Sequence, residues 1–507
     1  MRDIRGLWAK PNFFTPALFL GILGFLWIAA PVLHDARRLC PLSPDGVSES
    51  HAVSSFARQT GMSCVMCHTN FPELTPFGRR FKLNGYTMTT KPADVSDYSV
   101  TTDTQTAKRN LFLSYVSPIS YGAQAAYGKW TRAPLDPNAG KPGGPPAGAQ
   151  TQGDTFLFPE QFSLFYAGRV TDEIGTWIQL TYSGSSGTVG IDNTELRYSA
   201  HRDDRKWVWG TFVNNTPGMQ DVYNTPLAAF AVPLFNVPSL YSQGAGTGVG
   251  GLRAPIFGSL AANSVGGGEY VWFDDSIYAE ASVYHSGSPG STAVGNPTLT
   301  ATGSRGAIDG AAPRARLAYE LDWDRSALEV GALAMQTSYL PGAIPDTFAS
   351  AKSPTTANLY RDAGADLQYQ YIGEDHIVTL LGAFTRERQS NNPAFVAASG
   401  GTSYTNADDF LSQASLTAEY YYRRRFGGLV NWVDTTGTND PLMNGANGSP
   451  KNQYWVFELD YMPWLNTKFI LQYDAYTIAN GNQSPFFGGS TKPSDNNTLV
   501  AGLWLAF

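Results

Sequence analysis

The chain has 507 residues, a length that permits either one large barrel or several small domains. Only 15% of the residues are charged and 13% are aromatic, yet the mean hydropathy of −0.22 is too polar for a bundle of membrane-spanning helices. Strands that alternate between apolar and polar side chains average to such a value, as in membrane barrels. The formal net charge of −7 argues against a nucleic-acid partner, because such a partner requires a basic surface.

The N-terminus has the order of a secretory signal. Basic residues precede an apolar stretch from Phe13 to about Val32. The stretch is about 20 residues long, which would also suit an uncleaved membrane anchor. We expect it to be removed, because an inner-membrane anchor conflicts with the outer-membrane barrel inferred below. Small residues at 26–30 and at 50–52 both fit a cleavage site, so residues 1–52 are predicted to be signal peptide and leader.

The most specific motif places Cys64, Cys67 and His68 at the Cys-x-x-Cys-His spacing of c-type haem attachment. Two thiols three residues apart can add to the two vinyl groups of one haem, and the adjacent imidazole then becomes the proximal iron ligand. A redox dithiol would require a βαβ context, and a zinc site would require further Cys or His residues nearby. The motif occurs once, so we predict one covalently attached haem c.

The sixth ligand of the iron has four candidates in the sequence, Met62, Met66, Met88 and His51. Met66 lies inside the attachment loop, and Met62 is close enough to His68 to stay on the proximal side. Met88 follows a predicted short helix that can turn the chain around. We therefore predict Met88 as the ligand, with His51 or five-coordinate iron as alternatives.

The short helix before Met88 has clear boundaries in the sequence. Thr75 is a suitable N-cap, Pro76 suits the first helical position, and Asn84-Gly85 is a stop signal. The basic residues of this helix, which can either pair with haem propionates or face solvent, are Arg79, Arg80 and Lys82.

Residues 53–109 are therefore predicted to form a small N-terminal α-helical cytochrome segment. About 40 residues separate His68 from the first expected strand, a length at which an independent core is marginal. The region that follows must therefore help to wall in the haem.

From residue 110 onward the chain alternates with period two and has almost no helical periodicity. Tyr319, Leu321 and Trp323, for example, share one face, while Glu320 and Asp322 point to the other. One face suits lipid and the other suits water. A water-soluble sandwich would also alternate, so alternation alone does not separate the two fold classes.

The C-terminus separates them. Every second residue from Leu499 to the terminal Phe507 is apolar, a pattern that resembles the last strand of bacterial outer-membrane barrels. Residues 110–507 are thus predicted to be an all-β, porin-like, transmembrane antiparallel barrel of about 16 strands. The segments begin near Asn110, Phe162, Thr176, Thr194, Lys206, Tyr270, Ser276, Ala315, Ser326, Asp362, Asp375, Phe410, Phe426, Gln453, Thr467 and Asn496.

Short polar turns such as Asp274-Asp275 alternate with long connections rich in Gly, Ser, Pro and Asn. In a closed barrel with an even number of strands, this alternation places every short turn with both termini, on the periplasmic side. The cytochrome segment would then lie at or in the periplasmic mouth. A barrel of this size has an aqueous lumen with room for a plug. The longest connection, 214–267, either folds inward or forms an external lid.

The stretches from Phe56 to His68 and from Phe77 to Tyr86 resemble the fused monohaem cytochrome-porins that act as outer-membrane iron oxidases. In that family a small N-terminal cytochrome is joined to a porin-like barrel and takes electrons from extracellular Fe(II). The specific match covers only this region, and the remaining chain fits the family in architecture. The resemblance implies haem attachment by Cys64 and Cys67 and ligation by His68, and it does not assign the sixth ligand.

A haem at the mouth of a barrel places a redox centre where the membrane insulates. We therefore predict an iron oxidoreductase-like electron-transfer protein of the bacterial outer membrane. Extracellular Fe(II) would be the donor, a periplasmic cytochrome the acceptor, and outer-membrane lipid the surroundings. The acidic residues that could attract iron in the long loops are Asp346, Asp408 and Asp409.

Three other functions share some of these features. A conduit for a different donor or acceptor has the same sequence pattern, and so does a diffusion porin whose haem-bearing segment is only a plug. A haem peroxidase is disfavoured, because the cytochrome segment offers no obvious distal acid-base pair.

Overall fold

The computed structural model describes residues 54–70, 73–88, 97–98, 113–114, 117–131, 153–184, 187–201, 206–215, 264–286, 307–340, 357–390, 406–440, 448–479, 481 and 492–507. The predicted signal and leader, 1–52, lie outside the described residues, as does nearly all of the 214–267 connection.

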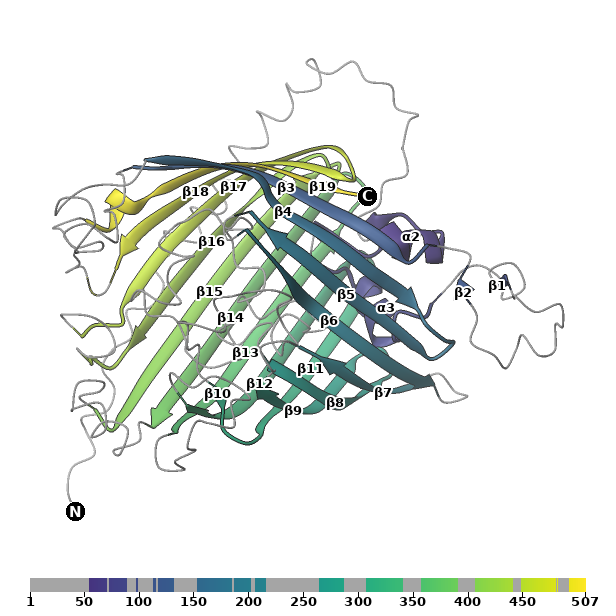
Figure 1. The fold of residues 1–507 in the computed structure, drawn as a ribbon, viewed down its shortest axis with the longest axis horizontal. Coiled ribbons are helices and arrows are strands. Elements are labelled where there is room, and N and C mark those ends of the chain that lie inside the picture. The colour runs from purple at the N-terminus through teal and green to yellow at the C-terminus, as the bar shows by residue number, and fades with distance from the viewer. Residues whose placement is uncertain are drawn as a thin grey trace. The chain divides into compact units, whose positions relative to one another are not determined.

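Within the described ranges, an antiparallel sheet of seventeen strands closes into a barrel (Figure 1). The ring closes where β19 pairs with β3, from Thr498 opposite Trp130 to Ala506 opposite Gly122. The two-residue β10 (Ala307–Ile308) only extends the edge of β12, which leaves sixteen ring strands in the described part of the chain. The ring strands are β3 (Ile119–Trp130), β4 (Asp154–Arg169), β5 (Ile174–Ser183), β6 (Thr188–His201), β7 (Trp207–Asn214), β8 (Ser264–Phe273), β9 (Ile277–Ser286), β11 (Ala312–Trp323), β12 (Ser326–Leu340), β13 (Asn358–Ile372), β14 (His376–Ser390), β15 (Asp408–Tyr422), β16 (Phe426–Gly437), β17 (Asn452–Trp464), β18 (Thr467–Ile478) and β19 (Thr498–Ala506). The predicted fold class and strand number are confirmed.

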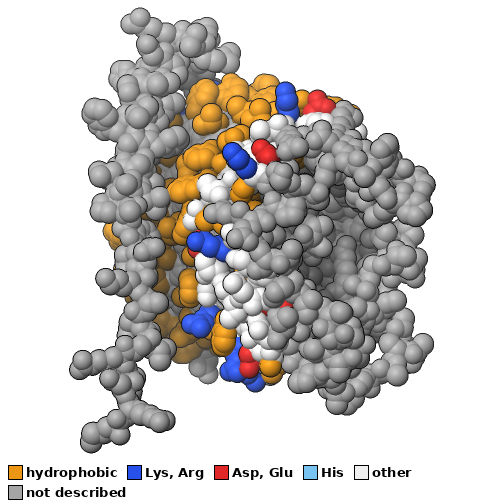
Figure 2. All heavy atoms as spheres, turned by 90° about the vertical axis from the view of Figure 1, so that its left-hand side faces the viewer, with side chains coloured by type: hydrophobic (Ala, Val, Ile, Leu, Met, Phe, Trp, Pro, Cys, Tyr) orange, Lys and Arg blue, Asp and Glu red, His pale blue; other side chains and the backbone are white. Residues whose placement is uncertain are grey.

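The outer face of the barrel is apolar and the inner face is polar. On β11, Leu317 is 60% exposed and Tyr319 is 47% exposed, whereas Arg316 and Glu320 are buried. Figure 2 shows apolar side chains gathered over the described outer surface, with charged side chains along one border. This distribution is the inverse of a water-soluble protein and is the arrangement of transmembrane barrels. The predicted alternation is therefore confirmed.

Four strands begin well away from their predicted positions. The first ring strand starts at Ile119 rather than near Asn110, and β4 starts at Asp154 rather than near Phe162. Strand β6 starts at Thr188 rather than near Thr194, and β8 starts at Ser264 rather than near Tyr270. The first half of β4 was missed because it contains Pro159, and proline is rare in the interior of a sheet. The ladder accommodates it at a register shift, where Gln124 pairs with Gln161 but Ala126 pairs with Leu157. The residues that precede β3 include β1 (Asp97–Tyr98) and β2 (Leu113–Ser114), which pair with each other.

Short turns lie at one end of the barrel, as the sequence predicted. Asp274 and Asp275 join β8 to β9 and both have positive φ, and Asp324 does the same between β11 and β12. We call this the short-turn end. One connection at the opposite end differs from the prediction, because β6 begins at Thr188 and is joined to β5 by only four residues, 184–187. Gly187 has a φ of 68°, which permits this tight turn.

The N-terminal part of the described chain is helical. It contains α2 (Ser54–Thr60), the 3₁₀ helix η2 (Cys64–Met66) and α3 (Pro76–Leu83). A further 3₁₀ helix, η5 (Pro493–Asn496), precedes β19. No helix in the described ranges is both long and apolar enough to cross a membrane. We call residues 54–70 and 73–88 the helical segment.

Candidate functional site

The structure brings Cys64, Cys67 and His68 together in one tight loop. The backbone N–H groups of Cys67 and His68 both donate to the carbonyl oxygen of Cys64, at 3.1 and 2.9 Å. His68 then pairs with Leu74 in an isolated antiparallel bridge, which folds the chain back on itself. The predicted attachment residues therefore share one compact local structure, which we call the attachment loop.

Helix α3 packs directly against the attachment loop through Gly78. A Cβ atom at this position would lie 2.2 Å from the carbonyl oxygen of Cys67, so only glycine fits. Thr75 adds two further contacts, because its N–H donates to Cys67 O at 2.9 Å and its hydroxyl donates to Met66 O at 2.5 Å. The start of α3 therefore fixes the shape of the loop.

The predicted boundaries of α3 are confirmed. Thr75 is the N-cap, and its hydroxyl accepts a hydrogen bond from Gly78 N at 3.1 Å. Pro76 is the first helical residue and Asn84 is the C-cap. Gly85 and Tyr86 have φ values of 67° and 59°, so the chain reverses direction directly after the helix.

Cys67 lacks the lowered pKa of a reactive redox thiol. Neither cysteine of the loop forms a disulfide, Cys64 is buried and Cys67 is half-buried. Burial, reinforced by the neighbouring Cys64, raises the pKa of Cys67 to about 12. The thiol is therefore protonated at neutral pH, whereas a reactive Cys-x-x-Cys thiol has a lowered pKa.

The hydrogen bond of the His68 ring defines its tautomer. Its Nδ1 lies 3.2 Å from the carbonyl oxygen of Glu73, and because a carbonyl only accepts, Nδ1 must carry the proton. This hydrogen bond sets the tautomer and leaves Nε2 as the nitrogen that can coordinate iron. Two thiols in one loop with such an imidazole fit the covalent attachment of a c-type haem.

Met88 is separated from the attachment loop by α3 and the turn at Gly85. Its carbonyl oxygen accepts a hydrogen bond from Gln59 of α2 at 3.1 Å, and the same amide group donates to Tyr86 O at 2.7 Å. The chain therefore turns back toward α2 as expected, and ligation by Met88 stays a prediction. Among the alternatives, Met66 is 46% exposed, and His51 lies outside the described residues.

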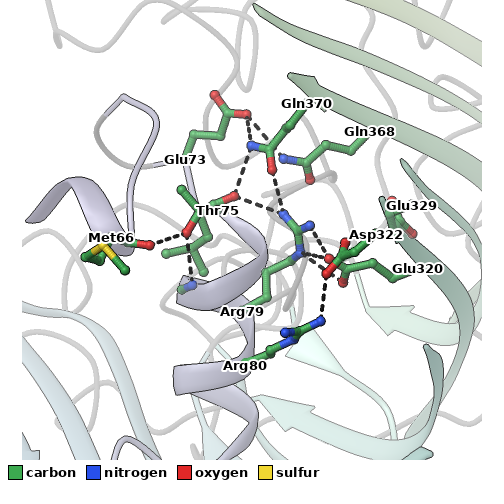
Figure 3. Close-up of polar contacts among 12 residues, drawn as sticks. Met66, Glu73, Thr75, Arg79, Arg80, Glu320, Asp322, Glu329, Gln368 and Gln370 are labelled. Atoms are coloured by element: carbon green, nitrogen blue, oxygen red, sulfur yellow. Dashed lines mark hydrogen bonds and ion pairs between the residues drawn. The ribbon is translucent and has the colours of Figure 1, made fainter. Parts of the chain in front are cut away.

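The basic residues of α3 bind the barrel wall (Figure 3). The Arg79 guanidinium is buried, its Nε lies 3.2 and 3.1 Å from the two carboxylate oxygens of Glu320, and its Nη2 forms an ion pair with the same carboxylate. Arg80 pairs with Asp322 at 2.6 Å. Lys82 is buried and lies within electrostatic range of Glu195. Arg79 and Lys82 are therefore buried against the wall rather than on a solvated face, and pairing of these basic residues with haem propionates stays a prediction. The sequence pattern could not assign the carboxylates of the wall to them.

Further contacts join the helical segment to other strands near the short-turn end. Tyr270 of β8 donates to the carbonyl oxygen of Leu83, and the Tyr86 hydroxyl donates to Glu195 of β6 at 2.8 Å. The N–H of Arg169 in β4 donates to the side-chain oxygen of Gln59 at 2.8 Å. The helical segment is thus held inside the short-turn end by several sides of the wall. The sequence had placed Glu320 and Asp322 on the polar face of their strand, but it carried no signal for what any of these wall residues bind.

The predicted loop acids have separate local roles where they are described. The exposed Asp408 pairs with Arg388 at 3.5 Å, and Asp409 accepts hydrogen bonds from Asn406 and Thr438. Asp346 lies outside the described residues. Within the described part of the chain, no group of three or more His, Cys, Asp and Glu side chains is arranged to hold a metal ion.

The chain is similar in outline to several outer-membrane proteins of known structure. A loop-deletion mutant of OmpT from Vibrio cholerae matches with 11% identity and a TM-score of 0.41, over 77% of this chain and 98% of that one. OmpF of Salmonella typhi, solved with daunomycin, gives 11% identity and a TM-score of 0.41 over 77% and 97% of the chains. The channel DcaP of Acinetobacter baumannii gives 10% and 0.37 over 77% and 96%. No protein-family model matches the sequence, and no curated protein does. The barrel assignment therefore rests on the strand pairing of this chain itself.

Proposed function

We propose that the protein is a cytochrome-porin of the bacterial outer membrane that oxidises extracellular Fe(II) and passes the electrons to a periplasmic cytochrome. One observation carries the proposal: a Cys-x-x-Cys-His loop is held inside one end of a barrel whose outer face is apolar. A haem c bound there would supply a one-electron redox centre. Neither a porin nor a soluble cytochrome requires both features in one chain.

The roles of the loop residues follow from their chemistry. Cys64 and Cys67 would form the two thioether bonds, and His68 would coordinate the iron through Nε2 while Nδ1 donates to Glu73 O. Met88 is proposed as the sixth ligand. Helix α3 would support the attachment loop through the Gly78 contact.

The orientation of the barrel determines where each substrate approaches. In bacterial outer-membrane barrels the short turns face the periplasm and the long connections face outward. The attachment loop would then be close to a periplasmic acceptor, and Fe(II) would approach from the long connections. Each Fe(II) loses one electron to become Fe(III), and the acceptor gains that electron, so iron itself has no need to cross the membrane.

A diffusion porin with a haem-bearing plug is the second candidate. The many polar side chains on the inner face favour it, since a polar lumen is what a solute pore requires. The two functions differ in what Fe(II) does to the haem. Only the electron-transfer function requires the haem to be reduced by Fe(II) across a sealed membrane.

Purified protein in sealed liposomes tests the proposal. Fe(II) added anaerobically on the long-connection side should reduce the haem, as followed by its absorption bands. The His68→Ala variant keeps the barrel and should lose the response. If the wild-type haem stays oxidised with Fe(II) over a range of pH but is reduced by a strong chemical reductant, the protein is not an iron oxidase.

Haem attachment has a separate test. The mass of the mature wild-type protein should include one haem, and the double variant Cys64→Ala plus Cys67→Ala should lose it. An unmodified wild-type mass would contradict the proposed cofactor.

A further inference from the structure

The polypeptide that holds the His68 imidazole is itself held by the barrel wall. The carbonyl of Glu73 accepts the hydrogen bond from His68 Nδ1 at 3.2 Å, and the following residue, Leu74, forms the bridge with His68. The orientation of the imidazole ring therefore depends on where residues 73–74 are fixed. Two side chains of β13, Gln368 and Gln370, fix them from the wall (Figure 3).

Both polar atoms of the Gln370 side chain form hydrogen bonds that hold residues 73–74 or Arg79. Its Nε2 donates to the Glu73 carboxylate at 2.7 Å and to the carbonyl oxygen of Leu74 at 3.1 Å. Its Oε1 accepts from Arg79 Nη1 at 3.1 Å. The side chain is fully buried, so water does not compete for these bonds.

Arg79 completes the clamp from the helix. Its Nη1 donates to Leu74 O at 2.9 Å, while its Nε and Nη2 are held by the Glu320 carboxylate on β11. The Leu74 carbonyl thus receives one donor from the wall and one from α3. Residues 73–74 are therefore held by buried side chains of β13 and by the buried Arg79 of α3, which is itself held by Glu320 of β11.

We propose that Gln370 is a positioning residue for His68: by clamping residues 73–74 it sets the orientation of the imidazole that would ligate the haem iron. The inference rests on the proposed haem, but it does not depend on Fe(II) as donor. A hydrogen bond from a metal-ligating histidine to a fixed acceptor determines the ring orientation and the basicity of the ligand. The barrel wall, rather than the short cytochrome segment alone, would then tune the redox centre.

The test compares two glutamines of the same inner face. Gln370→Leu removes the hydrogen bonds of Gln370 to Glu73 and Leu74. Gln389→Leu is the matched control, because Gln389 is also fully buried and, among the described residues, its amide donates to Glu387 of the same strand, β14. Both variants should retain the haem by mass. Only Gln370→Leu should broaden the low-spin ferric signal in electron paramagnetic resonance, because the ring then takes several orientations.

A third variant separates the orientation of the His68 ring from the effect of the Glu73 charge on the haem. Gln368→Leu removes a donor from the Glu73 carboxylate but does not touch Leu74. It should lower the midpoint potential, because the less compensated carboxylate favours the ferric state, and it should leave the resonance signal narrow. If Gln370→Leu behaves like Gln368→Leu, with a lowered potential and a narrow signal, or like Gln389→Leu, Gln370 does not position the ring.

If Gln370→Leu fails to fold, Gln370→Met replaces it. Methionine keeps the unbranched length of the side chain but has no N–H to donate to Glu73 or Leu74, so the same broadening is expected. A narrow, wild-type signal in haem-loaded Gln370→Met would overturn the proposal. A wild type that holds haem but ignores Fe(II) would contradict the iron-oxidase function and leave the positioning test intact.

Discussion

The barrel and the helical segment are stabilised in different ways. The strands of the barrel are joined by a continuous ladder of backbone hydrogen bonds. For example, β14 and β15 pair over their whole length, from His376 opposite Tyr422 to Ser390 opposite Asp408. The helical segment has α2 of seven residues and α3 of eight, lengths at which an isolated helix is marginal in water. Side-chain contacts with the barrel wall therefore have to supply the stability that the backbone hydrogen bonds of these short helices do not.

The ion pairs of the molecule also differ in burial. Exposed pairs such as Arg325–Glu374 lie at the turns, where solvent screens them. The pair that joins Arg79 of α3 to Glu320 is buried, and removal of one partner leaves a charge without water or a counter-ion. A single substitution on the wall can therefore release the helical segment without opening the barrel.

The largest effect is expected from Glu320→Gln. The substitution keeps the shape but leaves the buried Arg79 guanidinium without its carboxylate, which should destabilise the docked α3 by about 3–5 kcal/mol. Hydrogen exchange of the α3 amides in detergent measures this free energy of opening. The barrel should remain folded, as judged by its heat-modifiable mobility in gels.

The double variant Arg79→Met plus Glu320→Leu is the control for that prediction. Loss of both charges leaves no unpaired ion, so most of the protection of α3 should return. Equal protection in Glu320→Gln and wild type would show that the ion pair does not dock the helix. Simultaneous loss of the barrel would show that the two regions are not separable.

The contact at Gly78 should give the next largest effect. In Gly78→Ala the new Cβ meets Cys67 O at 2.2 Å, so α3 must move away from the attachment loop, at about 1–3 kcal/mol. Haem incorporation measured by mass should fall with it. Gly382→Ala on β14 is the control, because its Cβ would meet only Leu416 at an ordinary 3.4 Å. Full haem loading with wild-type exchange in Gly78→Ala would rule out a close contact.

Local features of both regions could be predicted from the sequence. The N-cap at Thr75, the stop at Gly85 and the outward face of Tyr319 and Leu321 all follow from short-range rules, and the structure confirms them. Strand number was also accessible, because each strand repeats the same alternation. The start of β4 was not, because Pro159 interrupts the pattern that defines a strand.

The contacts between the regions could not be predicted. Parity placed Glu320 on the polar face of its strand, but its partner Arg79 lies 241 residues away in sequence, and Gln370, which Arg79 also bonds, lies 291 residues from Arg79. Alternation determines only which side of the wall a residue faces. It does not determine which side chain stands opposite across a lumen, because that depends on the depth at which the helical segment docks.

A smaller effect is expected at the N-cap of α3. Thr75→Ala removes the acceptor for Gly78 N and the donor to Met66 O, and loss of an N-cap costs about 0.5–2 kcal/mol. Exchange of the first-turn amides of α3 should accelerate accordingly. Thr75→Ser keeps the hydroxyl and should retain most of the protection. If the serine variant exchanges as fast as the alanine variant, the hydroxyl is not the stabilising group.

The smallest effect should come from the neighbouring residue, Arg80. It pairs with Asp322 on the strand that supplies Glu320, at a good distance of 2.6 Å, but the two side chains are 35% and 31% exposed. Water solvates both groups after the pair is broken, so Arg80→Ala should cost at most about 1 kcal/mol, and high salt should reduce that further. Hydrogen exchange of α3 in Arg80→Ala and in Glu320→Gln under identical conditions makes the comparison direct. The two pairs join the same helix to the same strand, but Arg79 is buried and also bonds to Gln370 and Leu74, whereas Arg80 makes one exposed contact with Asp322. If Arg80→Ala releases α3 as fully as Glu320→Gln does, net charge rather than burial holds the helical segment in the barrel.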